Sequence, residues 1–154
     1  MAIEMRDAAR QLRGAVELKI YKNGVLKEVD RDHNLIVMAG RSKLAKLLGG
    51  GYAGHINRIG VGTGSTPAAD NDTGLTGTAY IPISSTEYDA GKVKFNFVIG
   101  TDQANGMAIR ELGLFFDDNT IFSRRVRKSV IGKEEDWPDP RRLDSLNERK
   151  LFKS

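Results

Sequence analysis

The chain of 154 residues contains no cysteine, one tryptophan, two histidines and no long apolar run. The absence of cysteine excludes disulfide bonds and thiolate metal sites. No apolar stretch approaches the ~20 residues that span a bilayer. Residues 1–14 contain no apolar core of the kind a secretion signal needs. We therefore expect no membrane segment and no signal peptide, with stability supplied by packing and backbone hydrogen bonds.

Glycine, in contrast, is abundant, with 17 residues. This exceeds the usual share of ~7% and indicates many turns, which favours strands over a helical bundle. A length of 154 residues suits one domain. Apolar residues alternate with polar ones between turn-forming segments, as in an antiparallel sheet. The sequence predicts a mostly β fold, either a β-sandwich or an open barrel of short antiparallel strands, with one or two short helices and an extended C-terminal arm.

The most distinct local pattern is a hairpin over residues 15–31, centred on Asn23-Gly24. Both turn residues tolerate positive φ, as a two-residue hairpin loop requires. That loop gives the register Leu18–Val29, Lys19–Glu28 and Glu17–Asp30. The last pair opposes two acids, so we expect the register to slip or bulge toward the open end.

Other elements follow from periodicity and turn residues. We expect a short helix at 2–13 and a second at 40–48, where Leu44, Leu47 and Leu48 share one face and Gly49-Gly50-Gly51 ends the helix. Expected strands are 56–62, 80–87, 92–99, 109–116 and 121–126, with a long loop at 63–77. In 92–99 the inward residues would be Val93, Phe95, Phe97 and Ile99, and the outward ones Lys92, Lys94 and Asn96.

Positive charge is concentrated at one end. Residues 124–154 hold ten Lys/Arg and six Asp/Glu, a net of +4, and the rest of the chain is balanced. The chain thus divides into an N-terminal helical arm (1–14), a β-rich core module (15–127) and an extended basic C-terminal arm (128–154). A basic arm can bind nucleic acid or an acidic protein face. Here Glu134, Glu135 and Asp136 interrupt it, so we expect nucleic acid to be an unlikely partner.

Three motifs could carry chemistry, and each has a simpler interpretation. Gly60-Val61-Gly62-Thr63-Gly64 follows a strand, but no Lys-Ser/Thr completes a phosphate loop, so close backbone approach and a tight turn are favoured. Asp70 and Asp72 resemble the start of a calcium loop without its terminal Glu, so a turn is again favoured. His33 and His55 belong to no metal-ligand spacing. We predict no catalytic residue, no metal site and no cofactor.

Glu111 lies within the apolar run 109–116. If it faces inward it needs a cationic partner, because burying an unpaired charge is costly. Arg124 or Arg125 on the adjoining strand could supply it. The alternative is a solvent-facing Glu on the outer side of the sheet, and the sequence leaves both open.

Trp137 lies in the polar C-terminal arm, where a large aromatic ring that stayed in solvent would bury no apolar surface. It could pack on its own sheet or insert into a neighbouring subunit, where Trp is a favoured anchor. We favour the neighbour. The predicted subunit-interface residues are Trp137, Arg141, Arg142, Leu143, Leu146, Leu151, Phe152, Ile3 and Leu12.

Three segments together resemble a recurring domain of tailed-phage tail and tail-fibre proteins. They are NLIVMAGRSKLAKLLGG, INRIGVGTGSTPAADNDTGL and MAIRELGLFFDDNTIFSRR, within residues 15–127. The resemblance rests on a glycine-ended helix, a strand entering a GTG-type loop and a later strand of the form E-[IL]-G-[LF]-F. It implies a β-rich structural module that assembles in symmetric copies around a tail, baseplate or fibre, and it implies no catalytic residues.

We therefore expect a non-enzymatic virion protein located in the tail and made in the host cytoplasm. It would act as an adaptor, collar, baseplate or fibre-attachment module, and its partners would be copies of itself and other tail, fibre or collar proteins. The alternative is a head or head–tail junction protein that decorates the particle or contacts DNA through its basic arm. A carbohydrate-acting enzyme would need paired acids in a cleft, whereas the acids here lie in expected turns.

Overall fold

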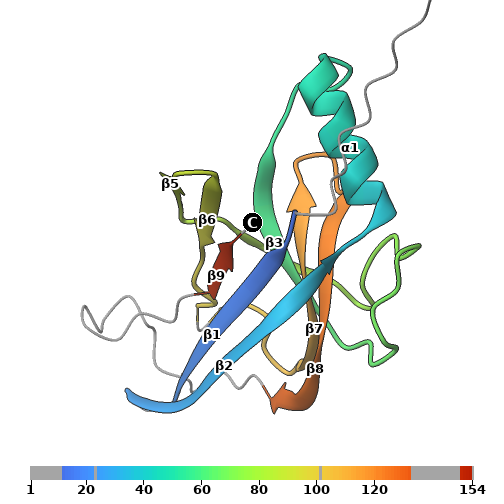
Figure 1. Cartoon of the computed structure of the whole chain (residues 1–154). Helices are drawn as coiled ribbons and strands as arrows, with labels where there is room; N and C mark the ends of the chain where they lie inside the picture. The colour runs from blue at the N-terminus through green and yellow to red at the C-terminus, as the bar shows by residue number, and fades with distance from the viewer. Residues whose placement is uncertain (1–11, 23, 101, 133–149, 154) are drawn as a thin grey trace, which may run out of the picture.

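The computed structural model describes residues 12–22, 24–100, 102–132 and 150–153, shown in Figure 1. These residues form one helix and a curled antiparallel sheet, which confirms the predicted mostly β fold. The elements are β1 (Gly14–Lys22), β2 (Val25–Ile36), α1 (Met38–Gly49), β3 (Ile56–Gly62), β4 (Ala79–Pro82), β5 (Ser85–Asp89), β6 (Lys92–Asn96), β7 (Ala108–Phe116), β8 (Ile121–Gly132) and β9 (Lys150–Lys153).

The sheet has the strand order β4-β3-β7-β8-β2-β1-β9-β6-β5. Its two edge strands, β4 and β5, are separated in sequence by only Ile83 and Ser84. The backbone N–H of Ile83 donates to Asn57 O at 3.0 Å, and that of Ser84 donates to Asn96 O at 2.8 Å. This short link bonds to both ends of the sheet, so the sheet curls into an open half-barrel rather than a sandwich.

Two predicted strands are shorter in the structure. The prediction of one strand at 80–87 was wrong, because β4 stops at Pro82, which has no N–H to continue the ladder. β6 ends at Asn96, although Phe97 and Ile99 are buried as predicted. Asn96, expected to face solvent, is instead buried, and its amide donates to Ser85 Oγ at 3.0 Å and Glu87 Oε2 at 3.1 Å.

The β1–β2 hairpin and the expected slip of its register are confirmed, but the bulge lies near the turn rather than toward the open end, so the predicted Leu18–Val29 and Lys19–Glu28 pairs were wrong. A bulge lies between Ile20 and Tyr21, close to the turn, so Leu18 faces Asp30 and Lys19 faces Val29. The one-residue shift places Glu17 opposite Arg31, and their side chains form an ion pair of 2.6 Å. The bulge therefore replaces the unfavourable pair of acids with a favourable one.

Helix α1 ends where the glycines predict. Gly50 has φ of 80°, a left-handed conformation that glycine adopts without a Cβ penalty, and Gly51 N donates to Lys46 O at 2.7 Å. Leu44 and Leu47 pack against the core, but Leu48 is 83% exposed, so its predicted place on the buried face was wrong.

The core fills the concave side of the curled sheet. Its buried members come from almost every strand, which makes the sheet one folding unit rather than two layers. They include Val16, Leu18, Ile20, Ile36, Ile59, Val61, Ile81, Phe95, Phe97, Ile109, Leu112, Leu114, Phe116 and Phe122.

The predicted domain boundaries differ from the structure at the C-terminal side. β8 continues past residue 127 to Gly132, and β9 pairs with β1 and β6, opposing Phe152 to Val16 and to Phe95. The end of the predicted arm thus belongs to the sheet of its own chain. At the other end, Gly14 already lies in β1, and Leu12 packs against the core. The predicted helix at 2–13 falls mostly outside the described residues.

Candidate functional site

Glu111 is buried and paired, which settles the alternatives that the sequence left open. It is 1% exposed, and its Oε2 accepts a hydrogen bond of 2.9 Å from Arg124 Nε. Its Oε1 accepts the backbone N–H groups of Gly64 at 3.0 Å and Thr76 at 2.6 Å. The long loop that follows β3 is therefore bound at both of its ends by one carboxylate. That carboxylate belongs to β7 and is paired with Arg124 of β8.

Arg124 fastens the middle of the same loop. Its Nη1 donates to Asp72 Oδ2 at 2.9 Å and Pro67 O at 3.3 Å, and its Nη2 donates to Thr66 O at 2.8 Å. Each guanidinium nitrogen thus has an acceptor, as a buried charge requires. We call this network of Glu111, Arg124, Asp72 and the loop backbone the Glu111 clamp.

The glycines of the GTG segment make room for this clamp. A Cβ on Gly62 would lie 2.5 Å from Glu111 Oε1 and 2.7 Å from Thr76 O, and one on Gly64 would lie 2.7 Å from Glu111 Oε1. The favoured interpretation of these glycines, close backbone approach, is therefore confirmed. The group that they admit is the protein's own carboxylate.

The acids of the loop serve as ion-pair partners. Asp70 binds Arg41 of α1 through two hydrogen bonds of 2.7 and 3.0 Å, and Asp72 belongs to the clamp. The hydrogen bond from Arg41 holds the pKa of the Asp70 carboxyl below its usual value. In the part of the chain that the structure describes, no three His, Asp or Glu side chains gather as metal ligands would.

On the neighbouring strand pair, arginines and acids form a second network. Cross-strand pairing places Asp30 beside Leu18 and Arg125 beside Leu112, and both leucines belong to the core, so these charges lie on the concave face. Arg125 Nη2 donates to Asp30 Oδ2 at 2.5 Å. Arg127 donates to Asp30 Oδ2 at 3.0 Å and to Glu28 Oε1 at 2.5 Å.

We call this second network the β2–β8 ion ladder; it consists of Glu28, Asp30 and Asp32 on β2 with Arg125 and Arg127 on β8. Asp32 is its outermost member, with Oδ2 at 3.9 Å from Arg125 Nε. Burial raises the pKa of Asp30, but hydrogen bonds and the charges of the two arginines outweigh this effect and leave the pKa below its usual value. The carboxylate of Asp30 is therefore ionised at neutral pH.

The ladder stands where two strands separate. β2 pairs with β8 only through Leu35–Arg124 and Ile36–Ser123, whereas β2 continues for ten residues on the far side of that contact. Figure 1 shows β2 and β8 meeting near α1 and then diverging. From Val25 to Asn34, β2 has β1 as its one strand neighbour among the described residues. We call the opening between them the β2–β8 slot.

The slot is a recess of about 370 Å³. It is bordered by His33 and Leu35 of β2, by the loop near Pro67 and by residues 124–128 of β8. No Asp or Glu is among the described residues that line it, and Leu35 is 38% exposed there. A ligand in the slot would meet two strand edges, an apolar rim and arginines.

Three buried donors of the ladder have no hydrogen-bond acceptor within the described residues. They are Nε and Nη1 of Arg125 and Nη1 of Arg127, and the two side chains are 4% and 1% exposed. A buried N–H without an acceptor costs about 1–3 kcal/mol. Unlike the Glu111 clamp, the β2–β8 ion ladder therefore keeps N–H donors that no acceptor, such as a carboxylate, binds among the described residues.

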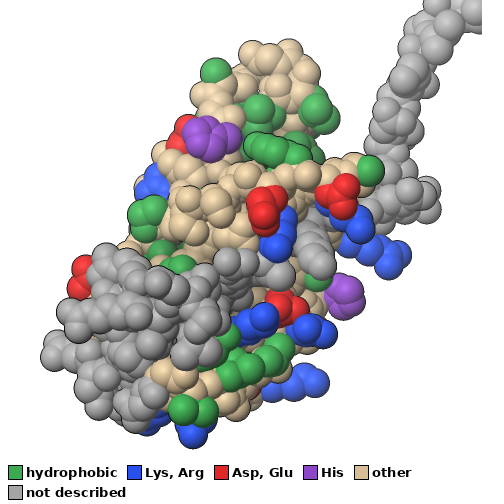
Figure 2. Space-filling model, turned by 90° about the vertical axis from the view of Figure 1, so that its left-hand side faces the viewer, with side chains coloured by type: hydrophobic (Ala, Val, Ile, Leu, Met, Phe, Trp, Pro, Cys, Tyr) green, Lys and Arg blue, Asp and Glu red, His purple; other side chains and the backbone are tan. Residues whose placement is uncertain are grey.

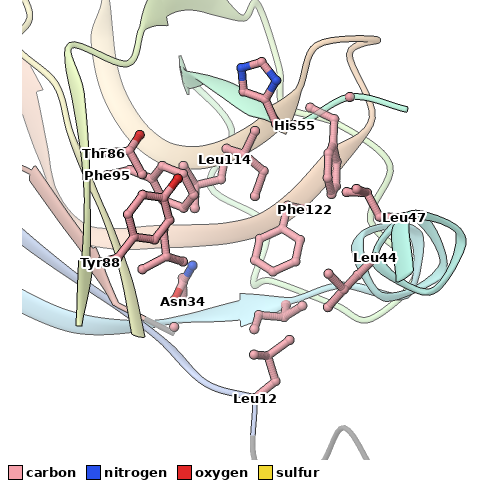
Figure 3. Close-up of a pocket in the computed structure, with 16 residues that line it drawn as sticks. Leu12, Asn34, Leu44, Leu47, His55, Thr86, Tyr88, Phe95, Leu114 and Phe122 are labelled. Atoms are coloured by element: carbon pink, nitrogen blue, oxygen red, sulfur yellow. The ribbon is translucent and has the colours of Figure 1, made fainter. Parts of the chain in front are cut away.

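An apolar cavity of about 330 Å³ lies between α1, the β5–β6 hairpin and the sheet, as Figure 3 shows. Leu44, Leu47 and Phe122 form one side, and Tyr88 and Phe95 form the other. Leu12, a predicted interface residue, also lines it. Leu12 thus contributes to a wall inside its own subunit.

Of the other predicted interface residues, Leu151 and Phe152 lie in β9, where their backbones pair with β1 and β6. Ile3, Trp137, Arg141, Arg142, Leu143 and Leu146 lie outside the described residues. The backbones of Leu151 and Phe152 therefore belong to the sheet of their own chain, and their role at an interface stays a prediction.

The β2–β8 ion ladder was missed by sequence analysis. One signal was present: Glu28, Asp30 and Asp32 alternate on one strand, and Arg125 and Arg127 alternate on another. In the sequence, the two arginines were counted with the positive charge of residues 124–154, and Glu28 and Asp30 were considered only in the hairpin register. Only the pairing of β2 with β8 brings them together.

No family model, no curated protein and no solved structure matches the chain. Among the described residues, no helix is long and apolar enough to cross a membrane.

Proposed function

We propose that this chain is a structural virion protein of a tailed phage, an adaptor, collar, baseplate or fibre-attachment module that acts by binding other protein subunits. The observation that carries the proposal is the Glu111 clamp. It unites two of the three segments that resemble phage tail domains, because Glu111 and Arg124 bind the loop from Gly64 to Thr76.

The third segment joins the same unit through α1. Arg41 binds Asp70 at the loop tip, and a Cβ on Gly40 would collide with the backbone of Phe122 in β8. The quoted motifs therefore have one shared role, which is to build a rigid module. This use of the motif residues suits a subunit that serves as a scaffold for assembly.

The charge distribution favours protein partners over nucleic acid. Arg124, Arg125 and Arg127, three of the ten cations counted in residues 124–154, are buried and paired with acids of the same chain. On the face shown in Figure 2, acidic and basic side chains are interspersed rather than segregated by sign. A duplex-binding surface would instead gather unpaired cations to neutralise phosphates.

The direct test is to purify particles of a phage that encodes this chain, and to identify their proteins by mass spectrometry and immunogold labelling. We expect the chain in stoichiometric amounts and the label on the tail. Its absence from intact particles would overturn the proposal. Label on the head, with DNA binding that weakens steeply as salt rises, would favour the head–tail junction alternative.

A further inference from the structure

We propose that the apolar cavity between α1, the β5–β6 hairpin and the sheet binds an uncharged, mostly apolar molecule that carries one hydroxyl group. The cavity supplies apolar walls, and Asn34 supplies a buried amide oxygen that has no hydrogen-bond partner among the described residues. This inference goes beyond the proposed function and does not depend on it, because it rests on the cavity alone.

The volume of the cavity sets the size of the ligand. It measures about 330 Å³, at the lower end of the ~300–1,000 Å³ that small-molecule sites enclose. An apolar cavity of about 150 Å³ holds one benzene ring. The cavity therefore has room for a ligand of about two fused aromatic rings, or for an aliphatic skeleton of similar size.

The walls of the cavity come from three separate parts of the fold. Figure 3 shows Leu44 and Leu47 of α1 on one side and Phe95 of β6 on the other. Leu114 of β7 and Phe122 of β8 add the surface of the sheet. A ligand in this space would displace water from the helix, the hairpin and the sheet at once. Removal of such apolar surface from water favours binding.

The lining also selects against a charged ligand. Among the described residues that border the cavity there is no Lys, Arg, Asp or Glu. His55 borders it, and Figure 3 shows its ring pointing away from Phe122 and Leu44. A carboxylate or ammonium group in this space would lose hydration without gaining an ion pair, which is costly. The ligand is therefore uncharged, unlike an ionised fatty acid.

Asn34 supplies the polar contact. It lines the cavity from the same face of β2 as the core residue Ile36, and it is only 9% exposed. Gly14 makes room for its amide, because a Cβ on Gly14 would overlap Oδ1 and lie 2.7 Å from Nδ2. The buried Oδ1 accepts no hydrogen bond among the described residues. Such an acceptor is unfavourable, and a bound ligand can supply its donor.

A hydroxyl group suits this amide better than a group that only donates or only accepts. An asparagine amide carries an acceptor oxygen and an NH₂ donor, and a half-turn of the amide exchanges their positions. A hydroxyl both donates and accepts, so it can bond to either atom. We therefore assign an alcohol or a phenol as the polar group of the ligand.

The first experiment titrates the full wild-type chain with naphthol, naphthalene and naphthoate, and follows leucine methyl groups by NMR. The probes share one ring system and carry a hydroxyl, no polar group and a carboxylate, respectively. We expect naphthol to shift the methyl signals of Leu44, Leu47 and Leu114. It should bind about two- to tenfold more tightly than naphthalene, and more tightly than naphthoate by about tenfold or more at pH 7.

Three outcomes of this titration would overturn the proposal. The first is that no probe shifts these methyl signals, as expected if another part of the chain fills the cavity. The second is that naphthalene binds as tightly as naphthol, which would remove the role of the hydroxyl. The third is that naphthoate binds as tightly as naphthol, which would show that the site accepts a charge.

Two matched substitutions on α1 then locate the binding site. Leu47 lines the cavity, whereas Leu48 is 83% exposed and is not among the described residues that line it. Leu47→Trp fills part of the cavity and should weaken naphthol binding by about tenfold or more. Leu48→Trp should change it by less than about twofold. Equal effects would place the probe elsewhere and would overturn the proposal.

Asn34→Leu tests the polar contact with a side chain of similar shape. Naphthol should then bind no more tightly than naphthalene, whereas naphthalene should stay within about twofold of its wild-type affinity, which shows that the cavity is intact. A retained preference for naphthol would contradict the role of Asn34. If this variant does not fold, the three probes on the wild-type chain decide. A chain that binds naphthol but is absent from phage particles would overturn the proposed function and leave this site intact.

Discussion

Neighbouring arginines on β8 serve two networks that differ in completeness. Arg124 points to the convex side, where each of its three nitrogens donates to Glu111, Asp72 or the loop backbone. Arg125 and Arg127 face the concave side and leave three buried donors unused. The comparison shows that the same residue type on one strand can have every donor paired or can keep buried donors without acceptors among the described residues.

The surroundings explain this difference. The Glu111 clamp is covered by a loop whose glycines allow the backbone to approach the carboxylate. The β2–β8 ion ladder spans a gap between diverging strands, where side chains replace backbone hydrogen bonds. The clamp should therefore dominate the stability of the module, and the ladder should contribute less. Three predictions test this comparison and a fourth sets a surface ion pair beside it, from the largest expected effect to the smallest.

Glu111→Ala should have the largest effect on stability. It leaves Arg124 buried without its main partner and frees the N–H groups of Gly64 and Thr76. Loss of one member of a buried pair costs about 3–5 kcal/mol. Urea unfolding followed by circular dichroism measures the change, and a loss below about 1 kcal/mol would show that the clamp contributes little.

Gly62→Ala should lower the free energy of unfolding by about 1–3 kcal/mol, because its Cβ would meet Glu111 Oε1 and the backbone oxygen of Thr76. The matched control is Gly74→Ala in the same loop, where an added Cβ meets nothing within 4 Å. The control should stay within about 0.5 kcal/mol of the wild type. Equal losses in the two variants would rule out crowding of the clamp as the cause.

Asp30→Asn should destabilise the fold by about 1–3 kcal/mol at neutral pH, because it weakens charged hydrogen bonds to Arg125 and Arg127. The folded-state pKa of Asp30 lies below 3.8. The stability that its charge adds is therefore present above pH ~4 and is lost as pH falls through the folded-state pKa. Unfolding curves from pH 7 to pH 3 should show the wild type and the variant converging, and a constant difference would contradict this assignment.

Asp118→Asn should have the smallest effect, about 0.2–1 kcal/mol, because its ion pair with Lys43 lies near the surface. The hydrogen bond from Lys43 lowers the pKa of Asp118 to about 2. Carboxyl titration by NMR should find this value in the wild type, and Lys43→Met should raise it toward 3.8. A pKa near 3.8 in the wild type would show that the pair does not form in solution.

Local patterns predicted much of the architecture. Alternating apolar residues located β3, β6, β7 and the first half of β8, and the glycine cluster located the end of α1. These features depend on side chains only a few residues apart, so the sequence displays them directly. The register of the β1–β2 hairpin was harder to predict from the sequence, because the bulge at Ile20 depends on which charges meet across two strands.

The sites were less predictable than the strands. Glu111 was recognised as a residue in need of a partner, but its choice of Arg124 over Arg125 depends on which face of β8 each arginine occupies. The β2–β8 ion ladder and the β2–β8 slot both result from the angle between these two strands beyond their short contact. That angle follows from the curl of the whole sheet, which no local segment determines.

By itself, the sequence determined that the chain folds into short strands with turns, because alternation and glycine placement act over a few residues. Only the tertiary structure decided that the GTG glycines surround a buried carboxylate, and that acids of β2 meet arginines of β8. Both results require segments far apart in the chain to pack together, and packing depends on long-range geometry rather than on local preference.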